Sequence, residues 1–344
     1  MRVIDALRLS LCSGAAWVCV TIGAATGAEP SPKSVPSALK LEHADGGDQD
    51  DLCFWYDAET PAESRIVTSD KAAGLIAVYN LKGEVQQLVK VPKPGNIDIR
   101  QDVECHGTKR DIVAVNQRTD GWKLVLLEMN RQTRKLERLD QGDLATGPNY
   151  GITLSKNPDR GTLDAIITSE DDDVEQYRIE IGADGRPSSK LLRSWKLGKC
   201  EGAVADDELG RLYIAVEEQG VWEVSAEGDQ PAPGELVIRL GEHGLKPDLE
   251  GISLVRKPDG KGYLFLSSQG QDRIFAYERG GKHEFIGSFS IQGAKETDGL
   301  DVIDQPLGEA FPHGAFGCHT AATKNPCVML TRWEKIAEVL GVSP

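Results

Sequence analysis

Short apolar runs alternate with polar, turn-rich segments along most of this sequence. In each repeat, a β-branched or apolar run is followed by a polar loop and then by a second run with an aromatic or long apolar residue. Five such pairs are 65–68 with 75–81, 111–115 with 124–127, 165–168 with 176–181, 212–215 with 221–224, and 263–267 with 274–277. Paired runs of this kind predict β-hairpins.

The paired runs recur at roughly fifty residues, which is the spacing expected of propeller blades. Six such units fit between Ile66 and Phe316, with little helical periodicity between them. Residues 333–340 are the one stretch that looks helical. The pattern therefore predicts an all-β chain folded as one six-bladed β-propeller. Loops from every blade of such a ring converge on one end of its central channel.

The N-terminal residues have a different character from the repeats. Arg2 and Arg8 precede a largely apolar run, 9–22, and small residues follow as far as Ala28. This order predicts a secretory signal peptide over 1–28 and a secreted or periplasmic protein. A short membrane anchor is the alternative, although the run is short for a membrane span. The polar segment 29–45, rich in Pro and Ser, is expected to be a flexible leader, and 46–344 the propeller domain.

Charge and cysteine content narrow the range of partners. The 344 residues carry a formal net charge of −15 and no basic stripe, so we expect no nucleic acid as a partner. No stretch after the N-terminal run approaches membrane-spanning length, so we expect no membrane partner either. An anionic substrate would need bound cations to mediate its encounter with this chain.

Five cysteines follow residue 28, and an odd number leaves at least one thiol without an intramolecular partner. Cys318 and Cys327 are the best candidate pair, and two free thiols are the alternative.

Acidic residues recur beside the predicted strands, next to Gly or Pro. They are Asp50, Asp51, Asp98, Glu201, Glu217, Asp248, Glu250 and Asp298. Each alone could be a solvated loop acid. Together they would converge on one rim and suit Ca²⁺, which takes about 6–8 oxygen ligands. Lys71 and Arg118 lie among them and are either phosphate-binding groups or ordinary surface cations.

The stretch from Asp50 to residue 83 resembles the first blade of the β-propeller phytases, the calcium-dependent 3-phytase family. The resemblance rests on Asp50-Asp51, Trp55, Pro61-Ala62-Glu63-Ser64, Thr68-Ser69-Asp70-Lys71 and Val78-Tyr79-Asn80-Leu81-Lys82-Gly83. It continues to about Val342. It implies a six-bladed propeller that hydrolyses phytate, myo-inositol hexakisphosphate, with several Ca²⁺ ions.

The resemblance also implies roles for individual residues. Asp50, Glu201, Glu217 and Asp298 match calcium ligands at the cleavage site, and Tyr150 matches a tyrosine that faces it. Asp51, with the backbone carbonyls of Leu52 and Ile97, matches a structural calcium site. Asp248, Glu250 and Gln269 match a further calcium cluster, and Lys71 and Arg118 match phosphate-binding residues. Catalysis would thus rest on Glu201, Glu217, Asp298 and Tyr150.

The sequence departs from the family pattern at several places. Glu170 begins an acidic turn where the family often presents a lysine to phosphate, and a single Asp-Gly element remains at Asp298. Gly95-Asn96-Ile97-Asp98 stands for Asn-Asn-Val-Asp, and Cys318-His319 for Gln-Asp. These differences bear on the number of metal ions and on substrate binding more than on the fold.

Three functions fit these features. The first is a secreted, monomeric, calcium-dependent phosphomonoesterase that attacks phytate with metal-activated water, since the chain has neither an Arg-His-Gly nor a Cys-x₅-Arg nucleophile motif. A calcium-dependent propeller lactonase and a non-catalytic calcium-dependent binding propeller are the alternatives.

Overall fold

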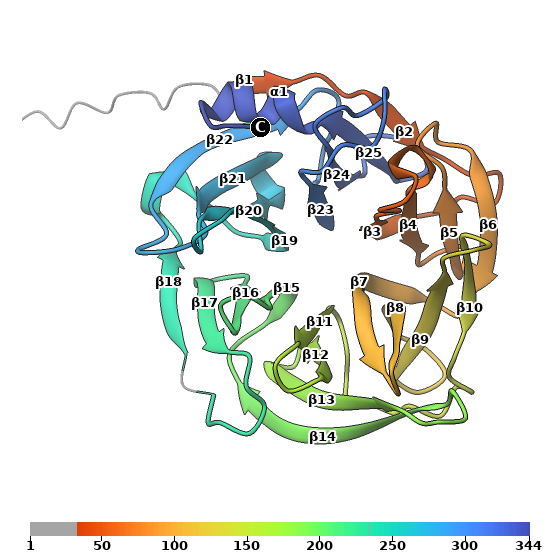
Figure 1. The fold of residues 1–344 in the computed structure, drawn as a ribbon. Helices are drawn as coiled ribbons and strands as arrows, with labels where there is room; N and C mark the ends of the chain where they lie inside the picture. Colours follow the sequence, from red (N-terminus) through yellow and green to blue (C-terminus); the bar gives the residue numbers. More distant parts are fainter. Residues whose placement is uncertain (1–32, 233) are drawn as a thin grey trace, which may run out of the picture. The chain divides into compact units, whose positions relative to one another are not determined.

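A computed structural model of the chain describes residues 33–232 and 234–344. In this part, six small β-sheets are arranged in a ring around a central channel (Figure 1). The prediction of an all-β, six-bladed propeller is therefore confirmed. The predicted signal peptide, 1–28, and residues 29–32 of the predicted leader lie outside the described residues.

The first four blades are four-stranded sheets built from consecutive strands. Blade 1 contains β3 (Gln49–Trp55), β4 (Arg65–Asp70), β5 (Leu75–Tyr79) and β6 (Val85–Lys90), and blade 2 contains β7 (Pro94–Cys105), β8 (Thr108–Gln117), β9 (Lys123–Asn130) and β10 (Lys135–Arg138). Blade 3 contains β11 (Ile152–Asn157), β12 (Thr162–Thr168), β13 (Asp173–Ile181) and β14 (Pro187–Lys196), and blade 4 contains β15 (Cys200–Asp206), β16 (Arg211–Val216), β17 (Gly220–Ser225) and β18 (Glu235–Arg239). The hairpins predicted from paired apolar runs are present in each of them.

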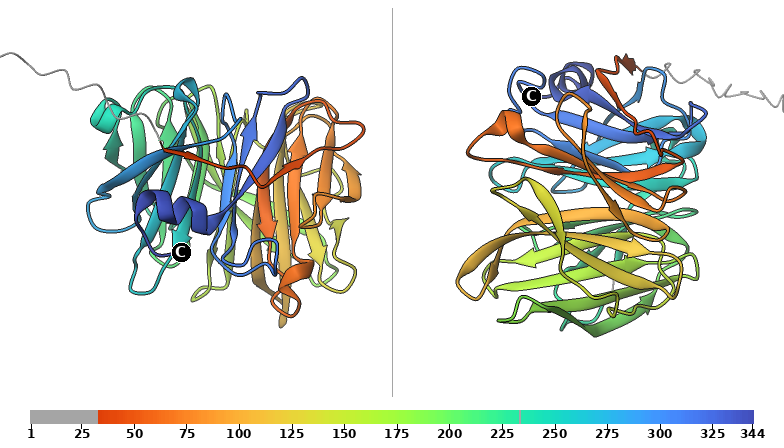
Figure 2. Two further views of the ribbon diagram at one scale, coloured as in Figure 1. Left: turned by 90° about the horizontal axis from the view of Figure 1, so that it is seen from above. Right: turned by 90° about the vertical axis from the view of Figure 1, so that its right-hand side faces the viewer.

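The last two blades are completed by the N-terminal residues of the described chain. Blade 5 contains β19 (Leu249–Arg256), β20 (Gly262–Ser268), β21 (Arg273–Glu278) and β22 (Phe285–Ile291), with β1 (Lys33–Val35) added parallel to β22. Blade 6 contains β23 (Leu300–Ile303), β24 (Ala315–Thr320) and β25 (Cys327–Arg332), with β2 (Leu39–Leu41) added antiparallel to β25. Figure 2 shows this N-terminal segment along the outside of these blades.

The prediction of a flexible leader as far as residue 45 is wrong for the part that β1 and β2 occupy. Val35 and Leu41 are fully buried, and β2 pairs with a strand almost 300 residues later, Leu39 facing Leu330. These apolar residues are too few in a Pro- and Ser-rich segment to predict strands by their spacing. The described propeller thus begins at Lys33 instead of residue 46.

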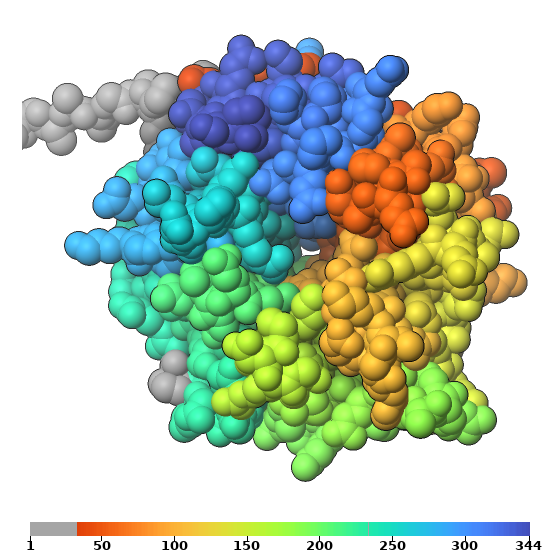
Figure 3. Space-filling model, in the orientation of Figure 1, coloured from red at the N-terminus to blue at the C-terminus, as the bar shows by residue number. Residues whose placement is uncertain are grey.

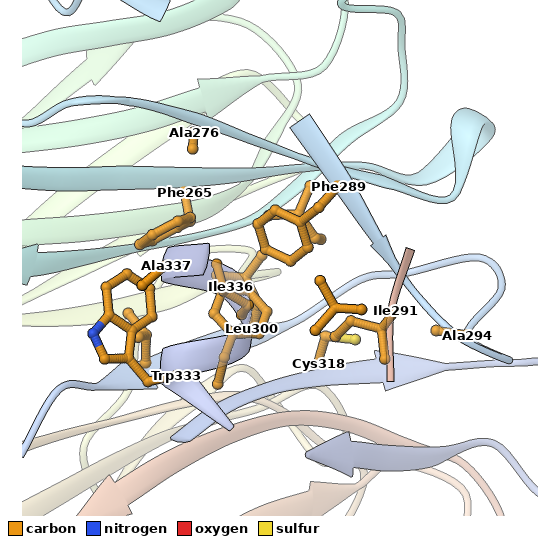
Figure 4. Packing of buried hydrophobic residues seen from close by; sticks show 14 of the residues in the cluster. Phe265, Ala276, Phe289, Ile291, Ala294, Leu300, Cys318, Trp333, Ile336 and Ala337 are labelled. Carbon is orange, nitrogen blue, oxygen red and sulfur yellow. The ribbon is translucent and has the colours of Figure 1, made fainter. Parts of the chain in front are cut away.

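The helix predicted at 333–340 is present as α1 (Trp333–Leu340). Trp333, Ile336 and Ala337 face an apolar cluster between blades 5 and 6, which Figure 4 shows. In this cluster the ring of Phe316 lies edge-on to Phe265, with 5.5 Å between ring centroids. Burial of each such side chain contributes about 1.5–3 kcal/mol, so contacts between blades stabilise the ring. Three short 3₁₀ helices, Pro61–Glu63, Glu242–Gly244 and Gln269–Gln271, lie in loops.

Two further sequence expectations concern cysteines and membranes. All five cysteines of the described chain are free, so the candidate pair Cys318 and Cys327 is not bonded and the alternative of free thiols holds. Among the described residues, none of the helices has the length and apolar character that crossing a bilayer requires.

The innermost strands β3, β7, β11, β15, β19 and β23 surround the central channel. Residues from all six line a cavity there, among them Asp51, Ile97, Thr153, Ser253 and Asp301. Figure 3 shows the channel open between the blades. The first residues of these six strands build the candidate site.

Candidate metal centre and active site

The innermost strands of four blades begin with the same irregularity. Register shifts leave two bulged residues at the start of β3, β7, β15 and β19, namely Asp50-Asp51, Gly95-Asn96, Glu201-Gly202 and Glu250-Gly251. In blades 3 and 6, Tyr150-Gly151 and Asp298-Gly299 directly precede the first regular pairs of β11 and β23. Bulges turn side chains away from the regular alternation and are frequent next to active sites. They place these six residue pairs at one end of the channel.

The glycine of the bulge permits close contact between neighbouring blades. A Cβ atom on Gly202 would lie 2.0 Å from the carbonyl oxygen of Glu250, and one on Gly251 would lie 2.4 Å from that of Asp298. No larger residue fits there without moving backbone. An acidic residue followed by glycine and an aliphatic residue is therefore the sequence signal for the bulges of β15 and β19.

Three carboxylates meet at the centre of the site. Glu201, Glu250 and Asp298 each offer an oxygen, and these oxygens lie within 4.8 Å of one another. All three side chains are buried, and Glu250 Oε2 has no hydrogen-bond partner among the described residues.

The electrostatics of these carboxylates favour a bound proton or cation. Burial, and then repulsion by Glu201, raises the pKa of Glu250 to about 10. Burial and repulsion by Asp298 raise the pKa of Glu201 well above its usual range, and burial and repulsion by Asp50 do the same for Asp298. An orphaned oxygen and an oxygen-only donor set fit a hard divalent cation. The residues present can therefore bind a metal ion.

Arg118, just after β8, lies across this cluster. Its Nη2 donates hydrogen bonds to Asp50 Oδ2 at 3.2 Å, Glu201 Oε1 at 3.2 Å, Asn96 Oδ1 at 3.1 Å and the backbone oxygen of Tyr150 at 2.7 Å. The guanidinium also stacks on the Tyr150 ring, 4.2 Å from the ring centroid. The structure thus brings together four of the predicted site residues, Asp50, Tyr150, Arg118 and Glu201, and adds Asn96, which the sequence analysis did not assign to the site.

Lys71 is the second predicted cation, and it lies on the other side of Asp50. Its Nζ is 2.7 Å from Asp50 Oδ1 and 3.3 Å from Asp48 Oδ2. Burial disfavours ionisation of Asp50, but Arg118 and Lys71 outweigh burial and hold its pKa below the ordinary value. Buried His319 is nearby, and burial lowers its pKa to about 4, so this ring is neutral above that pH.

Glu217 forms a second acidic group at the same end of the channel. Its Oε1 is 2.9 Å from Lys199 Nζ, on a side chain that is 47% exposed. Burial raises the pKa of Glu217, Lys199 opposes this effect, and the charges of Asp248 and Glu170 add to it. Glu170 therefore acts on this part of the site, and Lys199 is a site cation that the sequence analysis missed.

Asp248 and Gln269 are neighbours, since the backbone N–H of Gln269 donates a hydrogen bond to the backbone carbonyl oxygen of Asp248 at 2.9 Å. Repulsion by Asp248 also contributes to the raised pKa of Glu250. Glu250 thus connects the predicted cluster of Asp248, Glu250 and Gln269 with the carboxylates of Glu201 and Asp298.

Asp51, Leu52 and Ile97 lie deeper, where they line the channel cavity. Asp51 Oδ2 accepts a hydrogen bond from the Ile97 amide at 3.1 Å, and burial raises the pKa of Asp51 well above its usual range. Asp98 does not join the rim acids. Its carboxylate accepts hydrogen bonds from Arg100 and from the Thr153 hydroxyl, at 2.9 and 2.8 Å, inside the channel.

Comparison with known proteins identifies the family. A family model described as Phytase matches residues 1–344. The 3-phytase of Bacillus subtilis (strain 168) is 33% identical over 314 residues, which cover 86% of this chain and 82% of that protein.

Two solved structures share the fold at low sequence identity. A calcium-binding regucalcin from Agrobacterium tumefaciens strain C58 matches with a TM-score of 0.54 and 12% identity, over 87% of this chain and 95% of that one. A chain of a nidogen/laminin complex matches with a TM-score of 0.51 and 14% identity, over 76% and 87%. The family match and the identity to the Bacillus enzyme show that this chain belongs to the phytase family and is a phytase-like hydrolase.

Proposed function

We propose that this protein is a calcium-dependent phosphomonoesterase that removes phosphate from phytate at the end of the channel where the bulged residues lie. The observation that carries the proposal is the buried group of Glu201, Glu250 and Asp298, with cationic Arg118 and Lys71 beside it. The relatedness to a 3-phytase supports phytate as the substrate.

Calcium is the ion that these donors suit best. Carboxylates from several blades and amide oxygens such as those of Asn96 and Gln269 can form an irregular oxygen cage, which Ca²⁺ accepts more readily than smaller ions do. Bound there, the ion would lower the pKa of a coordinated water and neutralise charge on the phosphate.

The side chains around the cluster provide substrate contacts. The four hydrogen bonds that Arg118 makes in the described part all use Nη2, which leaves Nη1 for a phosphate oxygen. Lys71 and Lys199 are 30% and 47% exposed and can attract further phosphates of the same substrate. Phosphoryl transfer depends chiefly on such positioning and charge neutralisation.

The protein also controls protons at this site. Because the pKa of Glu250 is raised, its carboxyl can carry a proton at Oε2 when no cation is bound and release it when one binds.

We further propose that the protein acts outside the cytoplasm and as a monomer.

The decisive experiment measures phosphate release from phytate with calcium and with excess chelator. We expect release that requires calcium and falls at least about 100-fold in Glu250→Gln, which removes one ligand charge while keeping the shape. Glu104→Gln is the matched control, because Glu104 is an exposed acid near the opposite end of β7. Calcium binding without phosphate release would favour a non-catalytic binding propeller, and hydrolysis of lactones instead would favour the lactonase.

A further inference from the structure

The residue pairs at the start of the six innermost strands differ in the residue that comes first. Five of them begin with a large side chain at the site, namely Asp50, Tyr150, Glu201, Glu250 and Asp298, whereas blade 2 begins with Gly95. The ring of site side chains therefore lacks a contribution from blade 2 at this position.

The guanidinium of Arg118 fills the place that Gly95 leaves. A Cβ atom on residue 95 would lie 2.3 Å from Arg118 Nε and 2.6 Å from Nη2. The backbone of Gly95 does not have a positive φ, so its conformation does not itself demand glycine. Arg118, together with Asn116 Oδ1 at 2.6 Å from that Cβ position, is what excludes a side chain here.

In this place Arg118 neutralises two carboxylates of different blades. Its Nη2 lies 3.2 Å from oxygens of both Asp50 and Glu201, and the Arg118 side chain is 10% exposed. This fixed positive charge attracts the carboxylates of both Asp50 and Glu201 and so reduces the repulsion between them. It also repels any metal cation that approaches the same oxygens. A divalent ion that uses the same oxygens must weaken these ion pairs.

We propose that Gly95 admits Arg118 into the site as a built-in counter-cation, which holds the carboxylates together without metal and weakens their affinity for calcium. Gly95 is then a positioning residue that acts through Arg118. The inference rests on the calcium-dependent function proposed above.

Calcium binding to the substrate-free protein tests this inference, by titration calorimetry and by chelator competition from the calcium-loaded protein. We expect Arg118→Ala and Gly95→Ala each to bind calcium about tenfold more tightly than wild type, because each removes the repelling charge from the carboxylates. In excess chelator both should melt at a lower temperature than wild type. The double variant should bind calcium no more tightly than Arg118→Ala alone, because the added methyl group then displaces no arginine and meets only Asn116 Oδ1.

The matched control adds the same methyl group far from the site. Gly287→Ala in β22 meets one atom within 4 Å, a methyl group of Leu340 at 3.2 Å, and should leave calcium affinity unchanged. If Gly95→Ala does not fold, Arg118→Ala still tests the counter-cation by itself.

Unchanged or weaker calcium binding in Arg118→Ala would overturn the inference while leaving the proposed function intact. Additive effects of Gly95→Ala and Arg118→Ala would show that Gly95 does not act through the arginine. A wild-type protein that binds no calcium at all would overturn both the inference and the proposed function.

Discussion

Two buried acidic groups in this propeller differ in how their charges are compensated. Asp206 pairs with Arg279, whose guanidinium is fully buried and donates to both Asp206 oxygens at 2.5 and 2.6 Å. Glu201, Glu250 and Asp298 face one another instead; Arg118 pairs with Glu201, but Glu250 Oε2 has no partner among the described residues. Burial alone therefore does not mark a functional site here, and incomplete charge compensation does.

The largest expected effect concerns the compensated pair. Asp206→Ala leaves the Arg279 charge buried and without its main partner, which should lower the free energy of unfolding by about 3–5 kcal/mol. Urea unfolding of the calcium-loaded protein measures this change. The folded fraction should keep its rate of phosphate release per molecule, and a selective loss of that rate would show that the pair serves the reaction.

Removing a charge from the incompletely compensated group of Glu201, Glu250 and Asp298 should have the opposite effect on stability. Asp298→Asn and Glu217→Ala should each lower phosphate release by about 100-fold or more, because both remove a proposed ion ligand. In chelator, Asp298→Asn should melt at or above the wild-type temperature, since repulsion is relieved. Kinetics and thermal melts of the same samples separate the two effects. Near-normal turnover in either variant would remove that residue from the site.

The group of Glu201, Glu250 and Asp298 should also make stability depend on pH. Burial and mutual repulsion raise the pKa of Glu250 to about 10 and raise those of Glu201 and Asp298. Through these three carboxyls the folded state without metal binds more protons than the unfolded state above about pH 4, so their contribution to stability should fall as pH rises. The lowered pKa of His319, about 4, opposes this trend in part below about pH 6.5.

Thermal melts from pH 5 to pH 8 check this sign. We expect a falling melting temperature in chelator and a higher, flatter profile in excess calcium, because the ion binds the folded state and replaces the protons. A chelated protein whose melting temperature rises over this range would contradict the proposed repulsion.

The smallest expected effect concerns the acidic turn after β12. Glu170 acts on Glu217 and Lys199, so a positive charge there should attract a phosphate group. We expect Glu170→Lys to lower the KM for phytate by about three- to tenfold and to lower the calcium concentration at half-maximal rate. Asp184→Lys, in the exposed turn at the other end of β13, is the control. If KM and calcium dependence stay unchanged in Glu170→Lys, this turn does not face the substrate.

Local sequence patterns predicted the blades and much of the candidate site. Hairpin pairs such as 165–168 with 176–181 and the helix at 333–340 form as predicted, because each depends on neighbours in the chain. Glu201, Glu250 and Asp298 were predicted beside strands, and the ring brings them together because each opens the innermost strand of its blade.

Only the tertiary structure decided the rest. β1 and β2 complete blades 5 and 6 across separations of more than 250 residues, which no local pattern records. Asp98 and Glu201 are similar in sequence context, yet Asp98 bonds to Arg100 inside the channel and Glu201 faces two other carboxylates. Likewise the need for glycine at residue 95 comes from Arg118, 23 residues later and just after β8. Charge compensation depends on distances between blades, and the folded ring sets those distances.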